Sequence, residues 1–83
     1  MTINRIRYKL NTMLNTYKRN LSNLEIRQKA NQMMAEEAIR DGDIVKANRY
    51  IGRLKEIQEE MYKLTDILGQ IEDCFNKLDM ITA

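Results

Sequence analysis

The 83-residue chain contains no proline and no histidine, and its only cysteine is Cys74. A single cysteine cannot form an internal disulfide, and one thiol without histidine falls far short of a zinc site. Without histidine, the chain also lacks the commonest general acid–base and the Glu-x-x-His motif of carboxylate-bridged metal pairs. We therefore expect no metal, no cofactor and no enzymatic activity.

The remaining reactive side chains have plainer explanations than catalysis. Cys74 lies between Asp73 and Phe75, one residue from a predicted apolar row, and we interpret it as a buried or half-buried structural thiol. The carboxylates of Glu59 and Glu60, like those of the other adjacent Glu pair, point about 100° apart on a helix, so they do not chelate together. We interpret these pairs as solvated helix surface.

Long apolar runs are absent as well. No stretch approaches the ~18 apolar residues of a membrane span, and the N-terminal segment MTINRIRYKLNTML has no apolar core of the kind found in secretion signals. We expect no membrane association and a cytoplasmic location.

Charge is unevenly distributed although the net charge is only +2. Residues 1–30 carry seven basic side chains against one acidic, whereas residues 31–83 carry seven basic against eleven acidic. Either oppositely charged helices pair with each other, or the basic segment binds an acidic partner. We favour the first, because the acidic half is present in the same molecule.

The residues that are abundant favour helices throughout. One apolar row, spaced by three and four residues, predicts a helix over about 2–20: Ile3, Ile6, Leu10, Met13 and Tyr17. Ser22 and Glu25 match a capping box and predict a second helix over about 22–41; the alternative is one helix that runs through. The apolar face of this second segment is Ile26, Ala30, Met33, Met34, Ala38 and Ile39.

Residues 41–43 predict a tight turn. Gly42 suits the left-handed position that ends a helix, and Asp43 suits the N-cap of the next one. A calcium loop is disfavoured, because Val45 and Lys46 replace a ligand and the required glycine. The surrounding stretch AEEAIRDGDIVKANRYIGRL resembles one helix–turn–helix unit of a tetratricopeptide repeat, which implies an antiparallel hairpin.

The longest predicted helix covers about 43–81. Its apolar row is Ile44, Ala47, Ile51 and Leu54, followed by Ile57, Met61, Leu64, Leu68, Ile71, Phe75 and Leu78. Two successive three-residue steps, Ile51–Leu54–Ile57, predict a stammer. Gly52 suggests a close helix approach, and Gly69 offers a possible bend, although a continuous helix is favoured. The sequence thus predicts a single all-α domain over 1–83, either a helical hairpin or a three-helix bundle, with a long coiled-coil-like C-terminal helix.

A chain of this length has little core, and here neither disulfides nor metals supplement it. We therefore expect association, with a homodimer favoured. The predicted function is non-enzymatic protein–protein interaction through a helix face, as in a small inhibitor, regulator or chaperone. The predicted interface residues are Met33, Met34, Leu64, Ile67, Leu68, Ile71, Phe75 and Leu78.

Two other functions remain open. The basic N-terminal helix could bind nucleic acid through phosphate contacts from Arg5, Lys9, Lys18, Arg19 and Arg27. Alternatively, the chain could be a structural subunit of a larger helical assembly.

Overall fold

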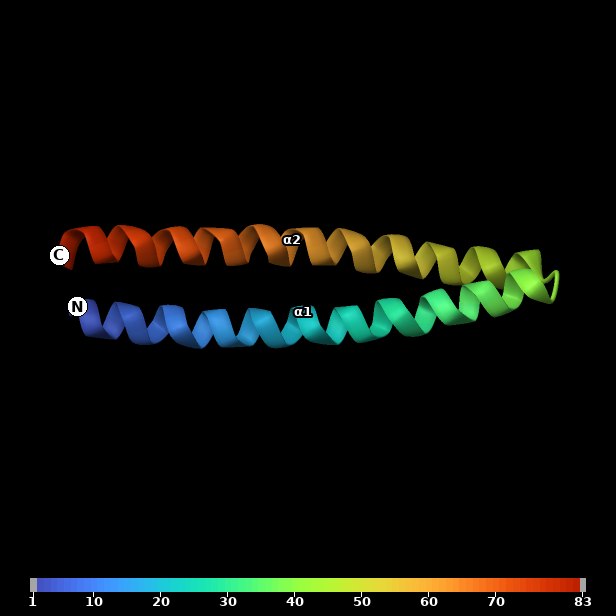
Figure 1. The fold of residues 1–83 in the computed structure, drawn as a ribbon, viewed down its shortest axis with the longest axis horizontal. Coiled ribbons are helices and arrows are strands. Elements are labelled where there is room, and N and C mark those ends of the chain that lie inside the picture. Colours follow the sequence, from blue (N-terminus) through green and yellow to red (C-terminus); the bar gives the residue numbers. More distant parts are fainter. Residues whose placement is uncertain (1, 83) are drawn as a thin grey trace.

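The computed structural model describes residues 2–82, which form two long antiparallel helices joined by one tight turn (Figure 1). Helix α1 spans Ile3–Arg40 and helix α2 spans Ile44–Thr82. The rod measures 60 × 16 × 15 Å, with both termini at one end, called the open end here. The all-α prediction is confirmed, and of the two predicted architectures the hairpin is found.

The three-helix bundle is wrong, because α1 has no break at Ser22. Leu21 is half-buried and Leu24 is buried on the side of α1 that faces α2, so a turn between them would remove both from the core. Ser22 and Glu25 instead lie exposed on the surface of a continuous helix. Burial of two leucines therefore outweighs a local capping signal.

Capping groups define the ends of both helices. The hydroxyl of Thr2 accepts a hydrogen bond from the Arg5 amide at 3.2 Å. At the turn, the amides of Gly42 and Asp43 donate to the carbonyls of Ile39 and Ala38, and Gly42 has φ 71°, a backbone conformation that favours glycine. The Asp43 carboxylate then accepts from the amide of Lys46 at 3.0 Å, which caps α2. The predicted turn is confirmed.

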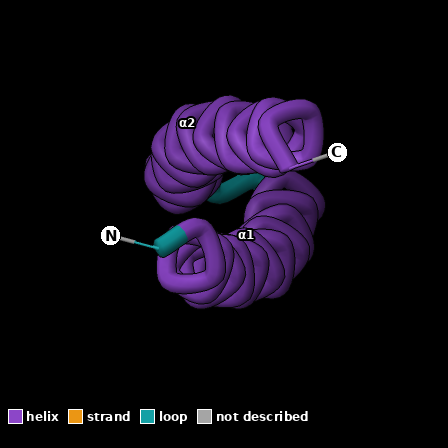
Figure 2. The backbone as a smooth tube through the Cα atoms, turned by 90° about the vertical axis from the view of Figure 1, so that its left-hand side faces the viewer, coloured by secondary structure: helices purple, strands orange, loops and turns teal. Residues whose placement is uncertain are grey.

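The inner face of α2 follows an unbroken heptad pattern. Its buried and half-buried residues alternate in three- and four-residue steps: Ala47, Tyr50, Leu54, Ile57, Met61, Leu64, Leu68, Ile71, Phe75 and Leu78. Tyr50, with the Arg53 guanidinium 5.2 Å from its ring centroid, occupies the position that the prediction gave to Ile51. The predicted stammer is therefore wrong. The two helices curve around each other, as a heptad pattern requires (Figure 2).

Neither helical glycine interrupts α2. A methyl group added at Gly52 or Gly69 would meet no atom within 4 Å. The close approach expected at Gly52 is therefore absent, and the helix continues through Gly69 without the alternative bend.

The inner face of α1 differs from the prediction. It consists of Leu10, Leu14, Tyr17, Leu21, Leu24, Gln28, Asn31, Ala35 and Ala38. Leu14 is half-buried where Met13 was expected, and in the second segment only Ala38 of the predicted face is buried. Because the helix is continuous, the positions of Leu21 and Leu24 against α2 determine which later residues of α1 face α2. Ile26 and Met33 consequently lie on the outer surface, 68% and 61% exposed.

The core is a single seam between two helices. Its buried residues are Leu24, Ala35, Ala38, Ala47, Ile57, Ile71 and Leu78. Among residues 2–82, no helix combines the length and the apolar character needed to cross a membrane.

Candidate interaction surface

Two long sides of the hairpin flank the seam, and both helices contribute to each. On one side, which we call the Cys74 face, every seventh residue of α1 lies next to the seam: Ile6, Met13, Asn20, Arg27 and Met34. The matching row of α2 is Arg53, Glu60, Ile67, Cys74 and Ile81. In the half of these two rows nearest the open end, every residue except Asn20 is apolar.

The opposite side, which we call the Glu72 face, has a different composition. Its α1 row is Asn4, Asn11, Lys18, Glu25, Gln32 and Ile39. Its α2 row is Ile51, Gln58, Thr65, Glu72 and Asp79. Apolar side chains occur in these rows only beside the turn, at Ile39 and Ile51.

An apolar groove of about 240 Å³ lies on the Cys74 face at the open end. Its lining residues are Ile6, Leu10, Cys74, Lys77, Leu78 and Ile81. Ile81 is 73% exposed, and Cys74 is exposed too, so the prediction of a buried or half-buried thiol is wrong. The one charged lining residue, Lys77, is bound to Asp73 of its own helix at 2.9 Å, and this hydrogen bond and charge raise the pKa of Lys77.

A second groove of about 390 Å³ continues along the same face. It is lined by Asn20, Asn23, Leu24, Arg27, Glu60, Lys63 and Leu64. Arg27 of α1 and Glu60 of α2 thus flank one groove, yet within the described residues neither side chain takes part in an ion pair. Opposite charges that remain unpaired within the chain are available to an external partner.

The Glu72 face has its own groove, of about 420 Å³. Its lining residues are Leu14, Lys18, Thr65, Leu68, Gly69, Glu72 and Phe75. The leucine and phenylalanine side chains form an apolar floor, but Lys18 and Glu72 stand exposed at its edges. Covering this groove would remove two charged groups from water, which is costly unless they pair.

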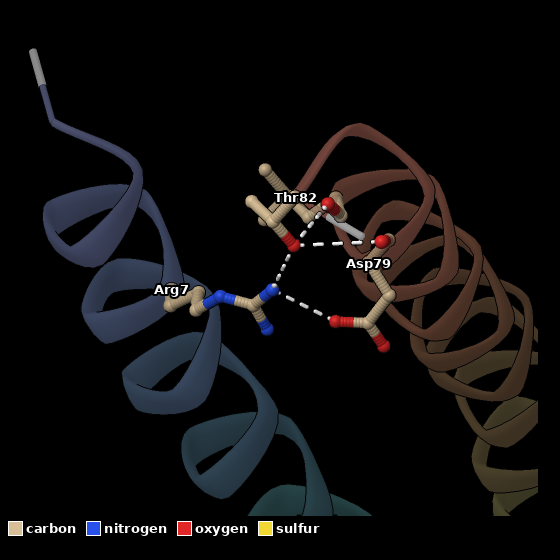
Figure 3. A network of polar contacts seen from close by, with 4 residues as sticks. Arg7, Asp79 and Thr82 are labelled. Carbon is tan, nitrogen blue, oxygen red and sulfur yellow. Dashed lines mark hydrogen bonds and ion pairs between the residues drawn. The ribbon is translucent and has the colours of Figure 1, made fainter.

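One polar network joins the two helices near the open end (Figure 3). Arg7 Nη2 donates to Asp79 Oδ1 at 2.8 Å and to Thr82 Oγ1 at 3.1 Å. The Arg7 and Asp79 side chains are 32% and 64% exposed, so solvent screens the pair and its contribution is small. Within residues 2–82 no other ion pair joins the helices, although α1 carries eight basic and three acidic side chains. Packing rather than opposite charge therefore holds the hairpin together.

Most predicted interface residues of α2 face α1. Ile71 and Leu78 are buried, and Leu64, Leu68 and Phe75 are half-buried in the seam. The half-buried Ile67 lies beside the seam, on the Cys74 face. The row predicted to bind a partner is thus largely covered within the chain.

The two methionines predicted at the interface lie apart from these residues. Met33 is on the outer surface of α1, and Met34 is on the turn half of the Cys74 face. Another exposed apolar group surrounds the turn: Ile39, Ile44, Val45 and Ile51.

The predicted nucleic-acid residues are all exposed but do not form one stripe. Lys18 lies on the Glu72 face and Arg27 on the Cys74 face. Arg5 and Arg19 share the outer surface of α1, and Lys9 lies between that surface and the Cys74 face. Their charges therefore surround the polar side of the helix.

Sequence reasoning missed the Cys74 face because it assigned Ile6 and Met13 to the seam. The available signal was a second apolar row on α2, Ile67, Cys74 and Ile81, spaced by seven residues and shifted one position from the seam. Such a row widens the apolar surface beyond what one partner helix covers.

Within residues 2–82, no three acidic or cysteine side chains cluster closely enough to hold a metal ion. In comparisons with known proteins, no family model, curated protein sequence or solved structure gives a significant match to this chain.

Proposed function

We propose that this chain is a non-enzymatic protein–protein interaction module that binds helices of a partner through the Cys74 face. The observation that supports the proposal is the exposure of Met13, Cys74 and Ile81 in one apolar stretch beside a single-seam core. By covering part of its partner, such a module acts as an inhibitor, a regulator or a chaperone.

A two-helix hairpin has one seam, whereas a bundle of four helices encloses a core. Helices laid on the Cys74 face would bury Ile6, Ile67 and Ile81 together. Fully burying an aliphatic side chain of this size is favourable by about 1.5–3 kcal/mol. Helix-in-groove binding lays the apolar face of a helix into a hydrophobic groove, and the Cys74 face has an apolar groove at the open end.

Cys74 allows a direct test because it is the only cysteine. A thiol-linked photo-cross-linker on Cys74 should give protein adducts when irradiated in an extract of the native cells. The control is Asn76→Cys in a Cys74→Ser background, which moves the label about 200° around α2, to its outer side. Adducts from Cys74 that the control lacks support the proposal, whether the captured protein is a second copy or another chain. Equal labelling from both positions, or none from Cys74, would contradict it.

Nucleic-acid binding is the second candidate, supported by the excess of exposed basic side chains on α1. It predicts salt-dependent binding of DNA or RNA that the triple variant Arg5→Glu, Lys9→Glu, Arg19→Glu abolishes. Titration of labelled oligonucleotides at low salt tests it, and absence of binding by the native chain dismisses it.

A further inference from the structure

We propose that the partner on the Cys74 face is a second copy of this chain, with the open ends of the two hairpins together and α1 of each over α2 of the other. The inference rests on the proposed function, because it uses the same face. It identifies the partner as a second copy, gives the relative orientation of the two hairpins, and names the charged pair that favours this arrangement, Arg27 and Glu60.

Two identical hairpins can bring this face together around a two-fold axis in two simple ways. If the axis runs along the rod, the open ends of the two hairpins lie together. Each position along one rod then faces the same position along the other, and α1 of one copy lies over α2 of the other. If the axis runs across the rod, the open end of one copy meets the turn end of the other, and each helix meets its own counterpart.

The lengthwise axis gives matched contacts at three of the five positions along the face; at the other two, Asn20 lies over Ile67 and Met34 over Arg53 of the second copy. Ile6 lies over Ile81, and Met13 lies over Cys74 of the second copy, so apolar residues meet apolar residues. Further along, Arg27 meets Glu60 of the second copy, and by symmetry Glu60 meets Arg27. The two charges that flank a groove without pairing in one chain thus gain partners in the dimer.

The crosswise axis gives mismatched contacts between the two copies of α2, although Met13 meets Met34 between the two copies of α1. Ile67 would lie over Glu60 of the second copy, and Cys74 would lie over Arg53. Covering an unpaired charge with an apolar side chain is costly. The lengthwise arrangement covers one charged residue of each copy, Arg53, with an apolar side chain, whereas the crosswise arrangement covers two, Glu60 and Arg53. The sequence of the face therefore favours the lengthwise arrangement, in which every neighbouring pair of helices is antiparallel, as in an up–down four-helix bundle.

The dimensions of the rod show which residues the dimer must use. A face 60 Å long and 16 Å wide offers roughly 1,000 Å² on each chain, compared with the ~800 Å² per partner of a standard stable interface. The apolar half alone provides roughly half of that area, which is too little for a standard interface. Contact must therefore extend past Asn20 to Arg27 and Glu60.

The test mixes two full-length charge variants, Arg27→Glu and Glu60→Arg. Each variant paired with itself would place like charges together at two points. The mixed pair would place opposite charges together at both points. We expect each variant alone to dimerise about tenfold more weakly than the native chain, and the mixture to form the mixed dimer preferentially. Native mass spectrometry, with one variant carrying a mass tag, measures the species directly.

The matched control is Lys18→Glu mixed with Glu72→Lys, the equivalent pair across the seam on the Glu72 face. This mixture should show no preference for mixed dimers. Circular dichroism of all four variants verifies that the hairpin is still folded. If Arg27 and Glu60 acted only within their own chain, the variants would fold less stably and the mixture would show no preference for mixed dimers.

The inference is overturned if the native chain is monomeric at high micromolar concentration, if the first mixture shows no preference, or if the control mixture shows the same preference. Photo-cross-linking from Cys74 separates the two proposals. Adducts with another protein and none with a second copy would leave the proposed function standing while removing this inference.

Discussion

The two faces that flank the seam are made by the same two helices and share one core, yet they differ in what they leave in water. On the Cys74 face, Met13 and Ile81 stand exposed beside an apolar groove. At the same end of the Glu72 face, the groove is bordered by Lys18 and Glu72. The row beside the seam, and not the seam itself, therefore makes one side of the hairpin apolar and the other charged.

The largest effect should come from the seam on which both faces depend. Ile57 is the most buried large side chain, 2% exposed. Ile57→Ala should lower the free energy of unfolding by about 2–4 kcal/mol, because it removes apolar contacts and leaves a cavity. Urea denaturation followed by circular dichroism measures this, and a loss below about 1 kcal/mol would show that the seam is not the main source of stability.

The next effect separates the faces. Met13→Glu combined with Ile81→Glu should weaken self-association about a hundredfold, because two apolar contacts are replaced by charges that lose water on burial. Sedimentation equilibrium measures the dissociation constant.

The control for this variant also replaces two apolar residues with glutamate, but on the Glu72 face: Ile39→Glu with Ile51→Glu. These isoleucines are 56% and 47% exposed, so both double variants alter surface positions. Association of the control should be unchanged. An equal loss in both variants would show that total charge, rather than the Cys74 face, governs association.

A smaller effect tests whether seam and face are independent. Asn31 is half-buried in the seam, and its amide donates only to the Arg27 carbonyl of its own helix, at 2.8 Å. Asn31→Leu should raise the free energy of unfolding by about 1 kcal/mol through apolar burial. Thermal melting measures the gain, and a change in the dimer dissociation constant beyond about threefold would contradict independence.

The smallest effect is expected at Gly69, which borders the groove of the Glu72 face. Because an added methyl group meets no atom within 4 Å, Gly69→Ala should stabilise the helix by about 0.5–1 kcal/mol and leave association unaltered. Urea titration measures the first quantity and sedimentation the second. Destabilisation would indicate that a partner approaches the backbone there.

The sequence predicts α2 far better than α1, and the reason is physical. From Ile57 to Leu78, every seam position of α2 carries a large apolar residue, so hydropathy and packing agree. In the second half of α1 they conflict, because the seam holds Gln28 and Asn31 while Ile26 and Met33 face outward. The continuity of the helix determines which residues of this half face α2, and the local hydrophobic pattern does not show that the helix is continuous. The turn was predictable because Gly42 and Asp43 act through neighbouring backbone groups alone.

The candidate face was only partly predictable for a related reason. The predicted interface included Ile67, but periodicity could not show that α1 of the same chain already covers Leu68 and Phe75. Which apolar residues remain exposed depends on the register between two helices. That register is a tertiary property.

The most direct test of the account is the alkylation rate of Cys74 as a function of protein concentration. If the Cys74 face is the surface on which two copies meet, the rate should fall several-fold as the chain dimerises. A thiol at position 76, in Asn76→Cys with Cys74→Ser, should react at a constant rate because it lies on the outer side of α2. A Cys74 rate that stays constant across the concentration range in which dimers form would contradict the account.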